Sequence, residues 1–322
     1  MMIPFGWLEQ AYERIAPFIH KTPLTYDSHN NIYLKWENHQ VTGSFKARGA
    51  LNKILSLQDW ELERGLVTAS AGNHGQGVAL AASIKHAQVK VFVSDHASPN
   101  KIQAMRKLGA EIHFVPGGYA EAESAGISFA KTTGTTWVSP YNDGMVIAGQ
   151  GTIGLDVLKE LPDPSSVTFL IPAGGGGLVS GIGSALQAHQ PRPRLLAIQS
   201  EASPFLHAIF HHGSQESVIE LPSLADGLAG PVEAGSVTIP MVMDYVDDII
   251  LVTEQEIRKA IKYAWITYHE CIEGSAAVTL AAALSGKVKS RPALAVLTGA
   301  NIDPAAHAQI INDFSIDLFQ TG

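Results

Sequence analysis

The sequence lacks most of the features that would suit it to a membrane, a secretory route or an oxidising compartment. Among 322 residues the only cysteine is Cys271, which excludes an intrachain disulfide and a cysteine metal cluster. No apolar run is long enough to cross a bilayer, and the N-terminus lacks the pattern of a secretory signal. We therefore expect a cytoplasmic protein without a membrane partner, in which Cys271 is a buried, unreactive thiol.

Basic charge is also scarce. The chain has 22 lysines and arginines against 30 aspartates and glutamates, which gives a formal net charge of -8. A field of that sign repels phosphate backbones, so we expect no nucleic-acid partner. Hydrophobic residues make up 46% of the chain and charged residues 16%, a globular composition that excludes disorder. The length suits two lobes.

From Gly65 onward, short apolar runs alternate with stretches of helical spacing. Six runs predict buried strands: Leu66–Ala69, Val89–Val93, Ile112–Val115, Val167–Ile171, Leu195–Gln199 and Leu294–Leu297. The spacing predicts helices over Gly75–His86, Asn100–Leu108, Ala120–Thr133, Gly149–Leu161, Leu178–His189 and Glu254–His269. This alternation indicates an α/β fold with parallel sheets covered by helices, whose ligands bind beyond the carboxyl ends of the strands.

Four consecutive glycines, Gly174 to Gly177, lie between a predicted strand and a predicted helix. Glycine lets backbone amides turn toward an anion, and the start of a helix adds a favourable dipole. The segment therefore predicts a phosphate cradle, although it lacks the lysine and hydroxyl of a P-loop. A tight turn that permits close packing, or a dinucleotide site, are the alternatives.

A lysine lies inside a small, mostly apolar segment that runs from Gly43 to Ala50. Desolvation lowers the pKa of an amine, and only the neutral amine attacks an aldehyde carbonyl. Lys46 is thus a candidate for a Schiff base with a cofactor. The alternative is an ordinary solvated lysine on a helix.

A third segment, from Ser70 to Gly77, again follows a strand with small residues. Ser70, Asn73 and the nearby backbone amides offer hydrogen-bond donors that suit a carboxylate or a ring hydroxyl. Helix capping alone would use the same residue types.

Taken together in this order, the three segments resemble the threonine dehydratase and serine racemase family of pyridoxal-phosphate enzymes, of fold type II in the tryptophan synthase β-like superfamily. Further matches are His20 to Leu24, Lys35 to Asn38, Ile147 to Thr152 and Ala225 to Gly227. The resemblance implies two open, mostly parallel twisted sheets with the cofactor in the cleft between two lobes. It also implies a homodimer, a large cofactor domain of residues 1–64 and 141–322, and a small substrate-loop domain of residues 65–140.

The resemblance also assigns roles to individual residues. Lys46 would form the Schiff base and carry the proton of the substrate Cα. The expected cofactor-binding residues are Phe45, Lys46, Asn73, Gly174, Gly175, Gly176, Gly177, Leu178, Gly227 and Thr298. The expected substrate-binding residues are Ser70, Ala71, Gly72, Asn73 and His74.

Two of these positions favour elimination as the reaction. Thr298 matches the residue that faces the pyridine nitrogen, and a hydroxyl there leaves the ring largely neutral, which suits elimination better than transamination. Serine racemases carry a serine at the position of Ala71, and alanine cannot transfer a proton. We therefore expect an ammonia-lyase that converts L-threonine, L-serine or both to a 2-oxo acid and ammonia, with a racemase as the runner-up.

Other readings stay open. A dehydratase for hydroxyaspartate or a hydroxyectoine-derived amino acid would need a further polar contact, for which His74, His211 and Arg48 are candidates by type alone. A protein that binds pyridoxal phosphate or an amino acid without turnover is the alternative from another class.

The sequence differs from the family pattern at two places, and its C-terminal part has two further features. Glu201 fits a possible cation ligand, but His207 stands where an aspartate is expected, so we assign no metal. Glu273 is followed by glycine where proline is common. Asp303 and Pro304 are expected to begin a last helix, with no regulatory domain after it.

Overall fold

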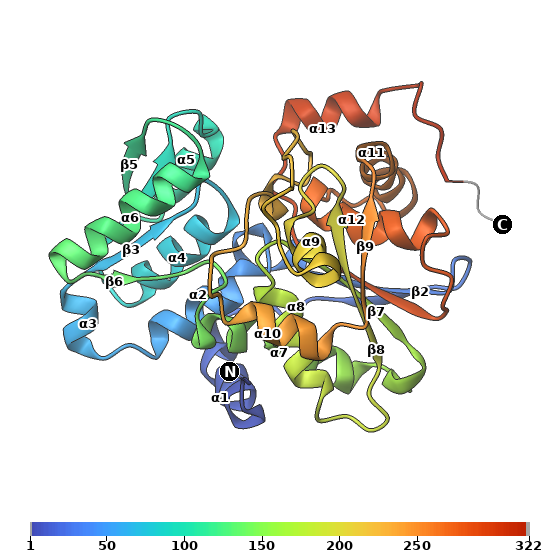
Figure 1. Ribbon diagram of the computed structural model, residues 1–322, viewed down its shortest axis with the longest axis horizontal. Coiled ribbons are helices and arrows are strands. Elements are labelled where there is room, and N and C mark those ends of the chain that lie inside the picture. Colours follow the sequence, from blue (N-terminus) through green and yellow to red (C-terminus); the bar gives the residue numbers. More distant parts are fainter. Residues whose placement is uncertain (1, 320–322) are drawn as a thin grey trace.

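The computed structural model describes residues 2–319, which form two sheets flanked by helices (Figure 1). The six-stranded sheet has the order β1 (Leu24–Asp27), β2 (Ile32–Trp36), β10 (Ala293–Leu297), β7 (Thr168–Pro172), β8 (Arg194–Ser200), β9 (Asp248–Val252). The four-stranded sheet has the order β5 (Glu111–Val115), β4 (Val89–Ser94), β3 (Leu66–Ala69), β6 (Thr136–Trp137). Every strand pair is parallel except β1 with β2. The predicted α/β fold with two mostly parallel sheets is confirmed.

All six predicted strands are present, as β3, β4, β5, β7, β8 and β10. Four other strands, β1, β2, β6 and β9, were not predicted. The sequences of β1, β2 and β6 do not form a clean apolar run, whereas residues 249–252 of β9 do form one. Strand β6 has only two residues, and β1 is an edge strand with two exposed positions. Strand β2 contains Lys35, whose fully buried ammonium donates a hydrogen bond to the carbonyl oxygen of Thr22 at 2.9 Å.

Within residues 2–319, thirteen α-helices flank the two sheets. They are α1 (Phe5–Ile15), α2 (Lys46–Leu55), α3 (Asp59–Glu63), α4 (Asn73–Ile84), α5 (Pro99–Lys107), α6 (Tyr119–Thr133), α7 (Gly144–Glu160), α8 (Gly177–Leu186), α9 (Phe205–His212), α10 (Thr238–Tyr245), α11 (Glu254–Tyr263), α12 (Gly274–Leu284) and α13 (Pro304–Ile311). The predicted helix over residues 254–269 is wrong at its end, because a π-helical turn, Ala264–Tyr268, follows α11. Asp303 begins α13 as expected, since its carboxylate accepts hydrogen bonds from the amides of Ala305 and Ala306.

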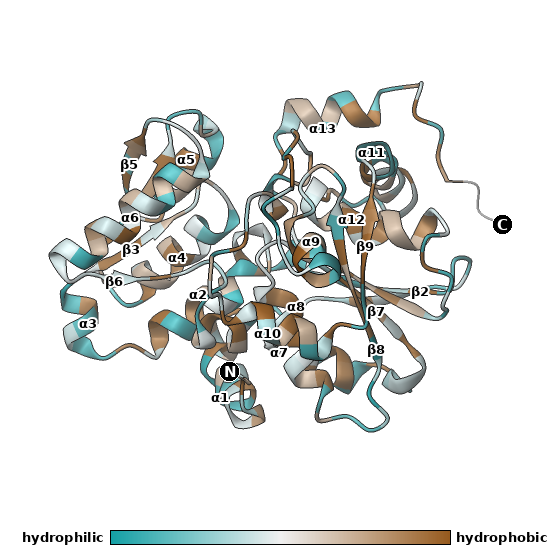
Figure 2. Cartoon of the chain, viewed as in Figure 1, coloured by the Kyte–Doolittle hydropathy of each residue, from teal (hydrophilic) through white to brown (hydrophobic). Residues whose placement is uncertain are grey.

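The hydrophobic core lies on both faces of each sheet. Figure 2 shows apolar residues along the strands and in bands on the helices that flank them, and these residues include the buried core clusters. On one face of the large sheet, α7 and α8 cross at a pair of glycines. A Cβ atom on Gly181 would lie 2.7 Å from the amide nitrogen of Gly151, so the two backbones pack too closely for larger side chains.

The strands of the smaller sheet lie within residues 66–137, whereas the larger sheet takes its strands from both ends of the chain. The domain boundaries at residues 64 and 140 stay a prediction. Among residues 2–319, no helix has both the length and the apolar character that crossing a membrane requires.

Candidate active site

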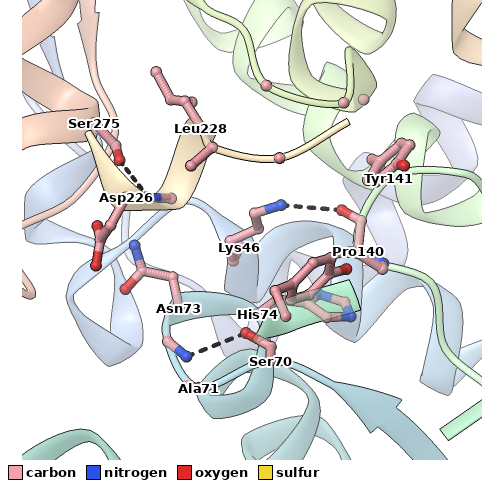
Figure 3. Close-up of a pocket in the computed structure, with 18 of the residues that line it drawn as sticks. Lys46, Ser70, Ala71, Asn73, His74, Pro140, Tyr141, Asp226, Leu228 and Ser275 are labelled. Atoms are coloured by element: carbon pink, nitrogen blue, oxygen red, sulfur yellow. Dashed lines mark hydrogen bonds between the residues drawn. The ribbon is translucent and has the colours of Figure 1, made fainter. Parts of the chain in front are cut away.

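A cavity of about 530 Å³ is lined by loops from both sheets (Figure 3). It lies beyond the carboxyl ends of β3, β7 and β10, the edge at which parallel sheets bind ligands. Every residue to which the family resemblance assigned a cofactor or substrate contact lines it: Phe45, Lys46, Ser70, Ala71, Gly72, Asn73, His74, Gly174, Gly175, Gly176, Gly177, Leu178, Gly227 and Thr298. Residues separated by up to about 250 positions therefore meet at one place.

Lys46 is the first residue of α2, and its amine extends into the cavity. Nζ donates a hydrogen bond to the carbonyl oxygen of Pro140 at 3.0 Å and lies 5.3 Å from the centre of the Phe45 ring. Burial among these groups lowers the pKa of the amine to about 8, although the negative charge of Glu273 works in the opposite direction. Lys46 therefore reaches its neutral, nucleophilic form far more readily than an exposed lysine.

The glycine segment forms the connection from β7 to α8. Gly176 has a φ of 87°, in the left-handed region that favours glycine, and it precedes the first residue of α8. A Cβ atom on Gly175 would lie 2.6 Å from the ring of Tyr141, so this loop also needs glycine for close packing. The first amides of a helix have no acceptors within that helix. Those of α8 border the cavity and suit an anion such as a phosphate.

The loop from Ser70 to His74 connects β3 to α4 on the opposite wall. The amide of Gly72 donates to Ser70 Oγ at 3.2 Å, and nothing lies within 4 Å of a Cβ atom built on Gly72, so the cavity is open there. Nε2 of His74 lies 3.1 Å from the carbonyl oxygen of Val138. Burial, and next the charge of Lys46, lower the pKa of His74 to about 3, so the ring is neutral.

Two groups in or beside the cavity were not given a role from the sequence. Glu273 lines the cavity and is 6% exposed, and Asn73 Nδ2 donates to its Oε1 at 2.6 Å. Burial, and next the charge of Asp226, raise the pKa of Glu273 to about 7. Tyr141 also lines the cavity and packs closely against the glycine segment, and its hydroxyl accepts a hydrogen bond from the amide of Glu233 at 2.9 Å. No short motif marks either contact, because each depends on residues far apart in the chain.

Two of the three candidates for a further substrate contact lie outside the cavity. Arg48 is fully buried in α2, where its guanidinium pairs with Glu37 at 2.8 Å and Asp156 at 2.9 Å. His211 lies on α9, 3.4 Å from Asp248. Only His74 lines the cavity, and its neutral ring cannot supply a positive charge.

Glu201, the possible cation ligand, is exposed and does not line the cavity. Within residues 2–319, no group of three or more histidine, cysteine or acidic side chains is arranged to hold a metal ion. Cys271 is half-buried, not buried as predicted, since it follows the π-helical turn in an irregular segment. Burial still raises the pKa of its thiol, which lowers its reactivity.

The fold and the site together define the class of protein. Enzymes of this class have two α/β sheets, and they carry an anionic aldehyde cofactor on a buried lysine near a glycine-lined helix start. The family model described as pyridoxal-phosphate dependent enzyme matches residues 11–299. The chain therefore belongs to the pyridoxal-phosphate dependent enzymes, as the sequence resemblance implied.

Individual relatives agree with this assignment. The L-threonine ammonia-lyase of Thermotoga maritima is 40% identical, over 97% of this chain and 79% of that protein. The solved structure of maize serine racemase superposes with a TM-score of 0.87 at 31% identity, covering 96% of this chain and 97% of that chain. The structure of the processed form of threonine deaminase isoform 2 from Solanum lycopersicum also superposes with a TM-score of 0.87. Its identity is 28%, and the match covers 96% of this chain and 94% of that chain.

The residues around the cavity fit pyridoxal phosphate. Lys46 would supply the amine that the aldehyde needs, and Gly174 to Leu178 would supply a turn and a helix start for the phosphate. Thr298, which follows β10 and is 2% exposed, would offer a hydroxyl without a charge to the pyridine nitrogen. Asn73, which also lines the cavity, would offer a side-chain amide hydrogen to the phenolic oxygen.

Proposed function

We propose that this enzyme is an ammonia-lyase that converts L-threonine to 2-oxobutanoate and ammonia and L-serine to pyruvate and ammonia. The observation that carries the proposal is the Lys46 amine, enclosed in the cavity with a pKa of about 8. The relatives that carry the name L-threonine ammonia-lyase support the choice of threonine.

When bound, pyridoxal phosphate supplies an electron-withdrawing ring that weakens the bond between Cα and its hydrogen. Lys46 Nζ, as a neutral amine, accepts that proton and holds it within the cavity. Ser70 Oγ and the amides from Gly72 to His74 bind and orient the substrate carboxylate. The ring of Phe45, whose centre lies 5.3 Å from Lys46 Nζ, would cover one side of the reacting centre and keep water away from it.

The identity of residue 71 supports elimination over racemisation. Racemisation needs a second proton donor on the face opposite Lys46. Ala71 lines the cavity in the substrate loop and has no ionisable or hydroxyl hydrogen to give. The enzyme is therefore expected to form keto acid without much D-serine.

Replacing Ala71 with serine is expected to introduce racemisation of L-serine, because a hydroxyl would then be available in the substrate loop. The measurement is chiral chromatography of serine together with a pyruvate assay. Ala120→Ser places the same hydroxyl elsewhere on the cavity wall and is expected to form no D-serine. Absence of D-serine from both variants would contradict the assigned role of position 71.

The pH dependence of cofactor attachment follows from the lowered pKa of Lys46. Only the neutral amine forms the bond, so the attachment rate is expected to rise about tenfold per pH unit and level off near pH 8. For an ordinary lysine, with a pKa of 10.5, the attachment rate would continue to rise up to the highest pH tested. The measurement is stopped-flow absorbance of cofactor-free protein mixed with pyridoxal phosphate between about pH 6 and 9.5.

Among the described residues that line the cavity, the cation other than Lys46 is already paired, which disfavours hydroxyaspartate as substrate. Arg48 and His211 lie elsewhere, and Lys101, which lines the cavity, is paired with Asp226 at 2.9 Å. The decisive experiment is a keto-acid assay with L-threonine, L-serine, D-serine and threo-3-hydroxyaspartate. Turnover of L-threonine supports the proposal, whereas cofactor binding without any keto acid would establish the non-catalytic alternative.

The finer predictions also belong to this proposal. We infer a homodimer and a cytoplasmic location from the family resemblance and the single cysteine. The roles of individual cavity residues and the division into residues 65–140 and the remainder are proposals of the same kind. Analytical ultracentrifugation tests the dimer directly.

A further inference from the structure

The side-chain amide of Asn73 is held at both ends. Asn301 Nδ2 donates one hydrogen to the carbonyl oxygen of Thr42 at 2.8 Å and the other to Asn73 Oδ1 at 2.7 Å. Because a backbone carbonyl can only accept, the orientation of both amides is fixed by this chain. Asn73 Nδ2 therefore faces Glu273 Oε1, at 2.6 Å, and has a second hydrogen left for the cavity.

Glu273 occupies the position that precedes α12, where short oxygen-bearing side chains often accept hydrogen bonds from the first amides of the helix. Its carboxylate makes no such bond. It turns toward the cavity instead, into space that exists because residue 299 is glycine. A Cβ atom on Gly299 would lie 2.6 Å from Glu273 Oε1.

The charges around Glu273 come from several elements. Asp226 acts against its ionised form, whereas Lys101 from α5 and the hydrogen bond from Asn73 favour that form. In turn, the charge of Glu273 favours the protonated form of the Lys46 amine. The carboxyl group and the amine thus share one enclosed cavity, and the proton affinity of each depends on the other.

We propose that Glu273 is a positioning residue with two effects, both exerted through neighbours. With Asn301, it aims the remaining hydrogen of Asn73 into the cavity, toward the phenolic oxygen of pyridoxal phosphate. Its negative charge also sets the pH at which Lys46 becomes able to attach the cofactor. The inference concerns cofactor attachment and does not depend on which amino acid the enzyme converts.

The test uses cofactor-free protein and two readouts: the dissociation constant of pyridoxal phosphate and the pH midpoint of its attachment rate. Glu273→Gln keeps an oxygen for Asn73 and removes the charge. It is expected to change the dissociation constant by less than about threefold and to lower the midpoint by about one unit. Asn301→Ala removes the other support of Asn73 without changing charge. It is expected to weaken binding about tenfold with an unchanged midpoint.

Glu270→Gln is the matched control, because Glu270 lies three residues before Glu273 and pairs with His39 outside the cavity. Its dissociation constant for pyridoxal phosphate and the pH midpoint of its attachment rate should equal those of the unmodified protein. A midpoint unchanged in Glu273→Gln would overturn the electrostatic effect. Unchanged affinity in Asn301→Ala would overturn the positioning effect, even if the Glu273 variant fails to fold. Neither result would bear on whether threonine is the substrate.

Discussion

Replacing Lys46 with alanine is expected to reduce keto-acid formation from L-threonine by at least about 10³-fold. Among the described residues that line the cavity, the other amine is that of Lys101, whose ammonium pairs with Asp226 at 2.9 Å. The fold should persist, because the Lys46 side chain lines the cavity and is not part of the hydrophobic core. The measurement is a coupled assay for 2-oxobutanoate, with circular dichroism to verify folding.

Lys53→Ala is the control for that variant, because Lys53 lies on the same helix and its ammonium pairs with Asp143 at 2.7 Å, away from the cavity. It is expected to retain nearly all activity. Turnover that survives in the Lys46 variant at the level of this control would contradict the assigned chemistry.

Replacing Gly176 with valine is expected to weaken binding of pyridoxal phosphate about 100-fold. Valine is strained at a φ of 87°, and its Cβ atom would lie 3.1 Å from that of Thr238. Relief of this strain moves the loop and turns the first amides of α8 away from the phosphate. Equilibrium dialysis of cofactor-free protein measures the effect.

Gly213→Val is the control variant that introduces similar backbone strain away from the cavity. Gly213 has a similar φ of 77° at the end of α9, with nothing within 4 Å of its Cβ position. Both variants should lose about 1–3 kcal/mol of stability, but only the Gly176 variant should lose cofactor affinity. Equal affinity in the two variants would remove the glycine segment from the phosphate site.

The sequence predicted the parts of the site that depend on local chemistry. The glycine segment, Lys46 and the loop from Ser70 each combine small residues with a strand end or helix start, and such combinations are visible over eight residues or fewer. The structure brings all three to one cavity. Their roles toward cofactor and substrate stay predictions for the variants described above.

Contacts between distant residues could not be predicted in the same way. Glu273 meets Asn73 across 200 positions, and Asn301 meets Asn73 across 228. Arg48 was a candidate for a substrate contact because of its type, but its carboxylate partners Glu37 and Asp156 are brought to it only by the fold. A buried arginine of this kind looks the same in the sequence as one that faces a ligand.

The fold shows the same division. Strands β7, β8 and β10 were predicted because they are buried on both faces and read as continuous apolar runs. Strand β2 was missed because it contains Lys35, and a lysine is not expected in a buried strand. Its ammonium is buried only because the folded chain supplies a hydrogen-bond acceptor, the carbonyl oxygen of Thr22.

The central claim is that one lysine carries the cofactor. Borohydride reduction of the protein with bound pyridoxal phosphate, followed by digestion and mass spectrometry, tests it directly. We predict a single modified peptide, labelled at Lys46. A label on any other lysine, or no label on protein that converts threonine, would contradict the account.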